Sequence, residues 1–479
     1  MPFGGINATR TAGELNRLPE DVSGRALLAG VTSKDGDAGR VFFLGRDVNL
    51  RSVLGRGSLA DLAIDHYVEL NARKPAIGVK ADPSIPGVLG ALSITGTSGG
   101  TAALSGDPAE DFELVAVITK AGQRGTAMVK ISFDGGDTFL PSALIPSDGA
   151  IEIADTGVTI TFTNHESVDP SFLAGDTWTA TVKGPAASAA DIVEALDAAI
   201  EANPDLDFEF VAVAGPSSAA DWAAYEQWSF DRAVSGKPCF FVCELAGRDY
   251  EDEEEDMDSW VSASRNEANS FATDRVAVVA GPVEVSRQGR TEHASPLGVF
   301  GSRIQAVTVN RQMSRVLDGK AAAIVRVDKA FTNTHALFLH DARINTVRRH
   351  NGHRSWYWSH ARTLAEDGSP YQSLPTVRAL DKLVRLALFA ATFSFGDDSS
   401  PLEGDGAGLG LLVANVKNAI VNGMVNRTPS ELVAVSVEIA PTTNLAADGK
   451  AIVVVKAQPV DHIEDIEIQI GVTSQLVTR

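Results

Sequence analysis

Residues 186–330 alternate between helical and strand patterns, and this alternation limits the fold more than any other feature of the sequence. One helical stretch spaces Ile192, Leu196 and Ile200 four residues apart and ends at an Asn–Pro pair. The strand-like run "FEFVAVAG" follows it, and further helix and strand patterns succeed one another as far as "AAAIVRV". Segments in this order fold as helices layered on a largely parallel sheet, so the sequence predicts an α/β domain here.

Residues 88–185 differ in texture, because they contain no convincing helical periodicity. Short alternating runs such as "FELVAVITK" and "DTWTATVKG" are separated by Gly, Asp and Pro at regular intervals. This pattern predicts a small all-β sandwich or barrel. We therefore expect an α/β core that is interrupted by an inserted all-β, sandwich-like domain.

A chain of 479 residues is too long for one typical domain. The changes in pattern divide it into the N-terminal part of the core with a possible N-terminal arm, the inserted β domain, the α/β domain, a C-terminal domain and a terminal strand. These parts occupy residues 1–87, 88–185, 186–330, 331–460 and 461–479. The expected fold class is therefore mixed α/β and multidomain.

The last of these segments carries a clear strand pattern. The apolar side chains in this segment are Ile466, Ile468, Ile470 and Val472. They alternate with polar residues or Gly, which is the period of a half-buried β-strand. No later strand is available to pair with this one as a hairpin. We therefore expect an extended C-terminal arm that joins a sheet elsewhere.

The charge balance excludes one class of partner. Lys and Arg number 41 and Asp and Glu number 62, which gives a formal net charge of −21. Duplex binding depends on neutralised phosphates, so a general nucleic-acid surface is not expected.

The two cysteines and the absence of a recognisable targeting pattern in the sequence indicate synthesis in a reducing compartment. Cys239 and Cys243 lie four residues apart on a strand pattern, which separates them by roughly 13 Å and excludes a disulfide between them. The sequence contains no signal-peptide pattern and no apolar run long enough to span a membrane. These features are typical of a chain made in a reducing cytoplasm.

Two groups of residues could hold a metal, and for each a structural interpretation is favoured. Asp134 and Asp137 flank a Gly–Gly pair, but a calcium loop needs more ligands in a set order, and Asp–Gly between alternating apolar residues is typical of a hairpin. Five of the nine histidines fall within residues 335–360. His350 and His353 could share a zinc ion, yet no Cys or HExxH pattern accompanies them, so a packed or interface segment is favoured.

No catalytic or cofactor signature is recognisable in the sequence. The glycines at 404, 406, 408 and 410 miss the register of a dinucleotide-binding fingerprint, and neither a P-loop nor a GxSxG motif occurs. The acidic run at 251–258 is typical of a solvated loop, although it could meet a basic partner. No cofactor and no metal are predicted. An enzyme remains an alternative, because a catalytic triad can be scattered through a sequence.

Several segments, taken together and in order, resemble the contractile-tail sheath proteins of bacteriophages and related contractile injection systems. They are "VLGRGSLADLAIDHYVELNARKP", "GALSITGTSGGTAALSGDP" with the β-rich stretch after it, "PLGVFGSRIQAVTVNRQMSRVLDGKAAAIVRV", "RRHNGHRSWYWSHARTLAEDGSPYQSLPTVRALDKLVRLA" and "IVVVKAQPVDHIEDIEIQIGV". The likeness covers most of the chain after residue 50. It consists of texture and segment order, with no single decisive motif.

The resemblance implies a structural and mechanical role without catalysis. Such a subunit polymerises into hexameric rings that stack helically around an inner tail tube, and contraction drives the tube through a cell envelope. The implied partners are further copies of the chain, the tube protein, and the baseplate and tail terminator proteins, with no direct nucleic-acid contact and no membrane insertion. The implied location is a virion tail, after synthesis in the bacterial host cytoplasm. The alternatives are another virion structural protein, such as a baseplate or spike component, and a cytoplasmic α/β enzyme.

The resemblance also gives the C-terminal arm a role. The arm would leave its own subunit and add a strand to a neighbouring subunit's sheet. The side chains expected to face inward are Ile466, Ile468, Ile470 and Val472. Head-to-tail contacts of this kind propagate into a helical array.

A second role concerns the helix expected at 376–392, in the C-terminal region that meets the tube in the resembling family. Arg378, Lys382 and Arg385 lie on one face of this helix, and Asp381 could pair with Arg385. Two interpretations fit this stripe of cations. One is an ordinary solvated helix face, and the other is a contact with the acidic surface of the tube or of a neighbouring subunit.

Overall fold

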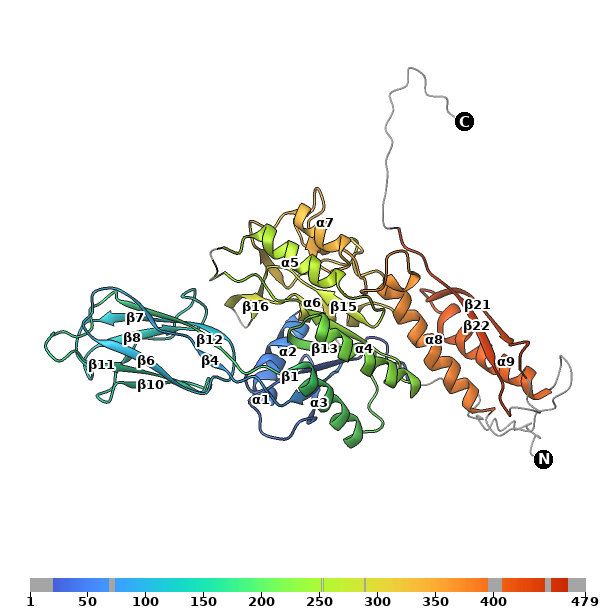
Figure 1. Ribbon diagram of the computed structural model, residues 1–479, viewed down its shortest axis with the longest axis horizontal. Coiled ribbons are helices and arrows are strands. Elements are labelled where there is room, and N and C mark those ends of the chain that lie inside the picture. The colour runs from blue at the N-terminus through green and yellow to red at the C-terminus, as the bar shows by residue number, and fades with distance from the viewer. Residues whose placement is uncertain are drawn as a thin grey trace, which may run out of the picture.

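The computed structural model describes residues 20–68, 74–250, 252, 254–287, 290–394, 407–443 and 449–463. They form an elongated molecule with three parts in line (Figure 1). An α/β domain lies in the middle, a helix-free β-rich part lies at one end, and a smaller part made of helices and a hairpin lies at the other. The mixed α/β class expected from the sequence is confirmed.

A six-stranded sheet forms the centre of the α/β domain. Its order is β15 (Val276–Val279), β14 (Phe240–Glu244), β13 (Phe210–Pro216), β1 (Ala26–Val31), β3 (Ala76–Ala81) and β2 (Val41–Leu44). Neighbouring strands are parallel, except that β2 is antiparallel to β3 at one edge. Every residue of β1 and of β15 is buried. Because successive side chains point to opposite faces, both faces of the sheet are covered.

Helices and two small sheets surround this central sheet. The helices α2 and α6 pack against each other and against β1 and β13, α3 packs against β1 and β3, and α4 packs against β14 and β15. The bounds are α1 (Leu50–Leu54), α2 (Ser58–Val68), α3 (Ala189–Ala202), α4 (Ala219–Val234), α5 (Met257–Asn269), α6 (Leu297–Ala306) and α7 (Asn333–Asp341). The small sheets contain β16 (Val283–Arg287), β17 (Arg290–Ala294) and β18 (Ile324–Val327), and β19 (Val347–Arg348) with β20 (Tyr357–Trp358).

The helix α3 illustrates how local sequence sets an element. The Ser188 hydroxyl accepts a hydrogen bond from the Asp191 backbone N–H, and the Asp191 carboxylate accepts one from the Ser188 backbone N–H. These two bonds satisfy N–H groups that have no partner within the helix. Ile192 and Leu196 are fully buried on the face turned to the sheet. The helix ends before Asn203, as the sequence predicts.

The segment from residue 88 to 183, all of it described, holds nine strands and no helix. They are β4 (Val88–Leu89), β5 (Ser93–Thr95), β6 (Thr101–Gly106), β7 (Phe112–Lys120), β8 (Met128–Ser132), β9 (Ala143–Leu144), β10 (Ala150–Ile153), β11 (Val158–Thr163) and β12 (Thr177–Lys183). One sheet runs β4-β12-β7-β8-β9 with β5 also on β12, and the other runs β10-β11-β6. We call this segment the β insert.

The β insert has its own hydrophobic cluster, separate from that of the central sheet. Phe162, Phe172 and Trp178 meet edge to face there, with ring centroids 5.6–6.0 Å apart. On its surface, the Asp134 carboxylate accepts hydrogen bonds from the Ser132 hydroxyl and from the Thr138 backbone, at 2.5 and 2.9 Å, in the loop after β8. Asp134 thus shapes its own loop, which is the hairpin interpretation given above.

The chain leaves the α/β domain for the β insert and returns to it at the same place. Ile85 and Ala186 pair in an isolated antiparallel bridge at its base. Glu110 of the insert is buried between Arg51 and Arg56 of the α/β domain, with 2.8 Å from Arg51 Nη1 to the carboxylate. The sheet of the α/β domain is therefore assembled from two stretches of chain, residues 26–81 and 210–279, on either side of the insert.

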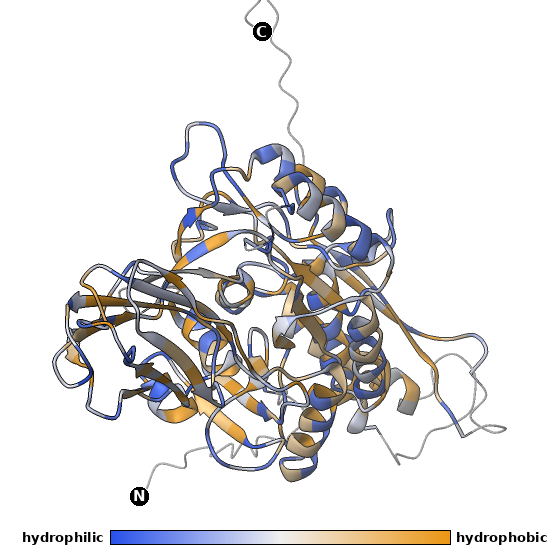
Figure 2. Ribbon diagram, turned by 60° about the vertical axis from the view of Figure 1, so that its left-hand side comes forward, coloured by the Kyte–Doolittle hydropathy of each residue, from blue (hydrophilic) through white to orange (hydrophobic). Residues whose placement is uncertain are grey.

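The C-terminal part contains α8 (Leu374–Thr392), α9 (Ala407–Ile420), a π-helical turn (Val421–Val425), and the antiparallel hairpin of β21 (Leu432–Ile439) and β22 (Val453–Pro459). The helix α9 packs on β21 and α8 packs on α9, and all three contribute to a third hydrophobic cluster. Apolar residues gather along the strands and along one stripe of each helix (Figure 2). Ile466, Ile468, Ile470 and Val472 lie outside the described residues. None of the described helices is long and apolar enough to cross a membrane.

Replacing residues 88–183 with a short Gly–Ser linker should leave the other two parts folded, because the β insert has a separate core and because Ile85 and Ala186 already lie side by side. Hydrogen exchange should then show β1 and β13 protected as in the full chain. As a matched control, Trp178→Ala should cost the insert alone about 3–5 kcal/mol. Loss of protection in β1 and β13 in the deletion variant would contradict a separately folded insert.

Candidate functional site at a domain junction

The helix α8 joins the C-terminal part to the α/β domain. Pro375 lies in its first turn, where a missing backbone N–H costs nothing. Leu383 and Leu386 are buried in the cluster shared with α9 and the hairpin. The cations at 378, 382 and 385 contact acidic side chains supplied by other segments of the chain. The apolar stripe of α8 therefore packs within the C-terminal part, and its charged stripe contacts the α/β domain.

Arg378 is fully buried, and its guanidinium forms a bidentate ion pair with Glu209. The Nε–Oε1 distance is 2.6 Å and the Nη2–Oε2 distance is 3.1 Å, and Nη2 also donates to the carbonyl of Ile304 at 3.1 Å. Glu209 comes directly before β13 and accepts a further bond from the backbone N–H of Gly24, two residues before β1. A single pair thus connects α8 to the two central strands.

Two more ion pairs lie along the same helix. Arg385 contacts Asp207 at 2.5 Å and donates to the carbonyl of Phe208 at 2.9 Å. Asp381 accepts two bonds from Arg275 Nη1, at 3.0 and 3.2 Å. The expected pairing of Asp381 with Arg385 within the helix is therefore wrong, because Arg275, directly before β15, reaches Asp381 with better geometry.

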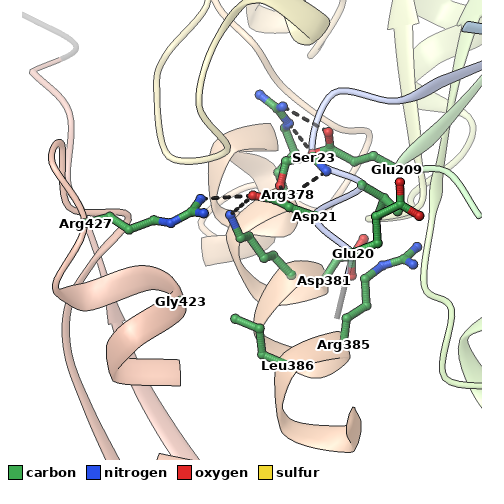
Figure 3. Close-up of a pocket in the computed structure, with 12 residues that line it drawn as sticks. Glu20, Asp21, Ser23, Glu209, Arg378, Asp381, Arg385, Leu386, Gly423 and Arg427 are labelled. Atoms are coloured by element: carbon green, nitrogen blue, oxygen red, sulfur yellow. Dashed lines mark hydrogen bonds and ion pairs between the residues drawn. The ribbon is translucent and has the colours of Figure 1, made fainter. Parts of the chain in front are cut away.

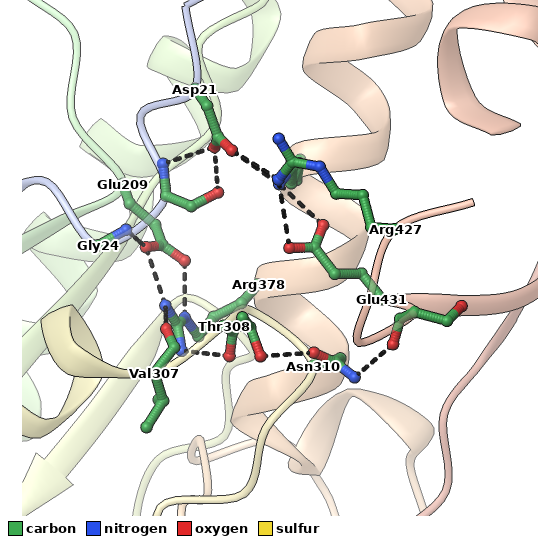
Figure 4. A network of polar contacts seen from close by, with 12 residues as sticks. Asp21, Gly24, Glu209, Val307, Thr308, Asn310, Arg378, Arg427 and Glu431 are labelled. Carbon is green, nitrogen blue, oxygen red and sulfur yellow. Dashed lines mark hydrogen bonds and ion pairs between the residues drawn. The ribbon is translucent and has the colours of Figure 1, made fainter. Parts of the chain in front are cut away.

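Lys382, Asp21, Arg427 and Glu431 form a closed ring of alternating charge, which we call the four-charge cluster (Figure 4). The nitrogen–oxygen distances around it are 3.1 Å for Lys382–Asp21, 2.8 Å for Lys382–Glu431, 2.9 Å for Arg427–Asp21 and 3.6 Å for Arg427–Glu431. Two carboxylates and two cations balance, so the cluster is neutral as a whole. It joins the segment before β1, the helix α8 and the turn before β21.

The pKa of Asp21 is lowered by its contacts in and beside this ring. Burial alone would raise the pKa of its carboxyl, but hydrogen bonds from Ser23 and the charge of Lys382 hold that pKa well below its usual value. The carboxylate is therefore ionised at all physiological pH values and keeps both of its cations.

A polar chain leads from the four-charge cluster to the end of the described residues. Asn310 donates from Nδ2 to the carbonyl of Ser430, the residue before Glu431, at 2.8 Å (Figure 4). The carbonyl of Asn310 lies 2.7 Å from Nε2 of His462. Residue 21, near the first described residue, and residue 462, near the last, are thus attached to the same junction.

A cavity of about 80 Å³ lies between α8 and the segment before β1 (Figure 3). Four acidic and four basic side chains line it, so it favours neither an anion nor a cation. It lies beside Ser23 and Glu209, at the amino ends of β1 and β13. Open α/β sheets bind ligands at the carboxyl ends of their strands. The arrangement is suited to holding two domains together and does not resemble a ligand site.

The three cations predicted on one face of this helix are Arg378, Lys382 and Arg385, and the structure places all three in the junction. Arg378 and Lys382 are buried and Arg385 is half-buried. The premise of an exposed stripe is therefore wrong, since carboxylates on other segments cover it. A contact with a tube or a neighbouring subunit would require these side chains to leave their partners, and we do not propose it.

The other residues considered from the sequence do not form a site in the part of the chain that is described. The rings of His350 and His353 lie 6.4 Å apart, and no group of three or more His, Cys, Asp or Glu side chains that could hold a metal occurs among the described residues. Cys239 and Cys243 are both free and buried, and burial raises the pKa of Cys239 to about 12. The glycines at 404 and 406 lie outside the described residues.

Removing one partner of the buried pair should destabilise the protein strongly. We expect Arg378→Met to cost about 3–5 kcal/mol of unfolding free energy, because Glu209 is left buried and unpaired. The double variant Arg378→Met/Glu209→Leu should cost less than the sum of its two single changes, as measured by urea unfolding in a double-mutant cycle. Lys456→Met, which breaks an exposed pair with Glu438, is the control and should cost under about 1 kcal/mol. Additive effects at 378 and 209 would contradict the coupling.

The four-charge cluster should make stability depend on pH in a defined direction. The folded-state pKa of Asp21 lies below its usual 3.8, so the stabilisation is fully present above that value and is lost as the pH falls toward the folded-state pKa. We expect Asp21→Asn to be less stable than the wild type at pH 7, with a gap that narrows below about pH 4. Urea titrations across this range measure the gap. Asp205→Asn, at an exposed carboxylate, should show no such trend, and a gap that does not change with pH would count against the ionised pair.

Comparison with solved structures shows which fold this is. The helical sheath of the anti-feeding prophage in its contracted state matches with a TM-score of 0.51 and 13% identity, over 98% of this chain and 99% of that one. The sheath complex of the PVC extracellular contractile injection system, also contracted, matches with a TM-score of 0.50 and 14% identity, over 98% of each chain. A sheath tail protein from Desulfitobacterium hafniense has a TM-score of 0.45 and 15% identity, over 95% of this chain and all of the other. The first two likenesses confirm, at the level of fold, the resemblance to contractile sheath proteins.

Sequence comparisons are less informative about function. A search of curated protein sequences finds no match. A family model described as "DUF2586, N-terminal domain" matches residues 3–362, which include the β insert, the central sheet and the β19–β20 hairpin. The chain belongs to the DUF2586 family.

Proposed function

We propose that this chain is the subunit of a contractile sheath, which polymerises around an inner tube and shortens to drive the tube through a cell envelope. The observation that carries the proposal is the fold match over nearly the whole length of both chains to a helical sheath in its contracted state. A chance likeness of one domain would leave the β insert or the C-terminal part unmatched. The partners that follow are further copies in hexameric rings stacked helically, the tube protein, and the baseplate and tail terminator proteins.

The proposed assembly contact is the addition of a strand. Within the described residues β21 and β22 pair only with each other, so each has one edge without a strand partner. The arm, with Ile466, Ile468, Ile470 and Val472, has the alternation of a strand that is half buried. We place the arm of one subunit against the β21–β22 hairpin of a neighbour, where backbone hydrogen bonds would supply attachment and the alternating side chains would set the register.

Contraction requires subunits that move as bodies while their connections persist. Two features support this mode of movement. The buried pair of Arg378 and Glu209 fixes the C-terminal part to the central sheet, and the four-charge cluster attaches the segment near residue 21 to the same place. A pull on either terminal segment would then act on one rigid junction. The β insert, at the far end of the molecule from the hairpin, would lie on the outside of the sheath.

Deleting residues 464–479 should abolish polymer formation without unfolding the subunit, because the arm would supply the link to the neighbouring sheet. Negative-stain microscopy of the purified protein should show cylinders or rings for the wild type and dispersed particles for the deletion variant. The far-UV circular dichroism of the rest of the chain should be unchanged.

The variant in which a linker replaces residues 88–183 is the control for this experiment. It should still polymerise, into cylinders of smaller outer diameter. Polymers formed by the 464–479 deletion variant would contradict the role of the arm. Failure of the wild type to form any ordered polymer under a range of salt and protein concentrations would contradict the sheath itself.

A further inference from the structure

A group of cations surrounds the β19–β20 hairpin, with Lys320, Arg349 and Arg354 exposed and Arg348 half-buried. We call it the cation patch, and it consists of Lys320, Arg348, Arg349 and Arg354, with His350 and His353 beside them. Lys320 pairs with Tyr357 of β20 in an isolated bridge, which places it next to the hairpin. Among the described residues no carboxylate forms an ion pair with any of the four Lys and Arg side chains. The described part of the subunit therefore does not neutralise the patch.

The sequence around this patch opposes the charge of the whole chain. Residues 311–362 contain ten Lys and Arg and only three Asp and Glu, whereas the full chain contains 41 and 62. Copies that each carry −21 repel one another, so an array of them needs local contacts of opposite sign. A concentrated positive surface on such a chain is suited to an acidic partner.

Arg349, one of the exposed cations of the patch, is held in place by its neighbours. The Arg349 guanidinium lies 4.1 Å from the centroid of the Trp356 ring, and its backbone N–H and carbonyl both bond to the Asn333 side chain, at 3.2 and 3.0 Å. Burial, together with the positive charge of Arg348 and of His353, lowers the pKa of His350, which is consistent with a locally positive field. A side chain positioned in this way loses less conformational entropy on binding than a flexible one.

The densest acidic segment of the chain is the run at 249–258, in which eight of ten residues are Asp or Glu. Asp252, Glu254 and Asp258 are exposed. Within one subunit this run ends beside α7, where Asp258 contacts His335 at 2.8 Å, and no ion pair joins its described residues to the cation patch. Asp252 and Glu254 form no ion pair with another described residue, so their exposed carboxylates are open to an outside partner.

We propose that the cation patch of one copy docks on the acidic run of a second copy, through the exposed carboxylates of Asp252 and Glu254. This inference rests on the proposed sheath function, since it assigns a contact between subunits of that assembly. The contact is electrostatic and lies at the surface, so it is weakened by salt. Such a contact can be broken and remade when subunits move past one another, while strand addition supplies the permanent link.

Charge reversal tests the proposal. Arg349→Glu/Arg354→Glu should raise the protein concentration needed for polymer formation at low salt by about ten-fold, equivalent to about 1.4 kcal/mol. Asp252→Lys/Glu254→Lys should have a similar effect. The chain with all four changes exchanges the two charges and keeps the net charge of the wild type, and it should polymerise as the wild type does. Lys120→Glu/Lys130→Glu, on the β insert, alters net charge as much as the first variant and should polymerise normally.

Sedimentation across a salt series from about 50 to 300 mM measures these effects, with circular dichroism of each variant to confirm its fold. Normal polymerisation of Arg349→Glu/Arg354→Glu at every salt concentration would overturn the proposal. If the chain with all four changes does not regain polymer formation like that of the wild type, the acidic run is not the partner of the patch. If the patch variant polymerises normally while deletion of residues 464–479 still abolishes polymers, only this inference fails and the sheath function stands.

Discussion

The buried ion pair between Arg378 and Glu209 is the constraint on which the arrangement of the molecule depends. A buried charge is stable only with its partner in good geometry, so α8 has one acceptable position against the strands β1 and β13. Well-packed apolar residues of similar size could be equally stabilising, but they would specify the position of α8 less strictly. We therefore interpret the pair as a device for specificity, which fixes the C-terminal part relative to the sheet.

The β insert imposes a second constraint, because it interrupts the chain between two halves of one sheet. The parallel pairing of β1 with β13 joins residues far apart in the sequence, and it can form only if the insert returns the chain to the point at which it left. The bridge between Ile85 and Ala186 provides this closure. Because the insert has its own core and its own ion pairs to Arg51 and Arg56, it extends the molecule without disturbing the sheet.

Cations have two separate roles in this acidic chain. Those on α8 are buried or half-buried and neutralise carboxylates at the domain junction, so they contribute to the integrity of the subunit. Those around Arg349 and Arg354 are exposed and have no carboxylate partner among the described residues. The difference arises from which segments the fold brings near each group. Helical spacing alone makes the α8 cations look like a surface stripe, whereas their actual partners lie in other segments, 49 residues away for Glu431 and more than a hundred for Glu209, Asp207 and Asp21.

The sequence by itself determined the features that depend on local periodicity. The alternation at 186–330, a helix-free stretch at 88–185 and a helix at 376–392 could all be predicted, because side-chain spacing of two or of 3.6 residues records which face is buried. Only the tertiary structure decided that Arg378 is buried against Glu209, that Asp381 pairs with Arg275, and that residues 21 and 462 meet at one junction. Each of these contacts joins distant segments, and a single sequence carries no signal of which distant carboxylate will reach a given cation.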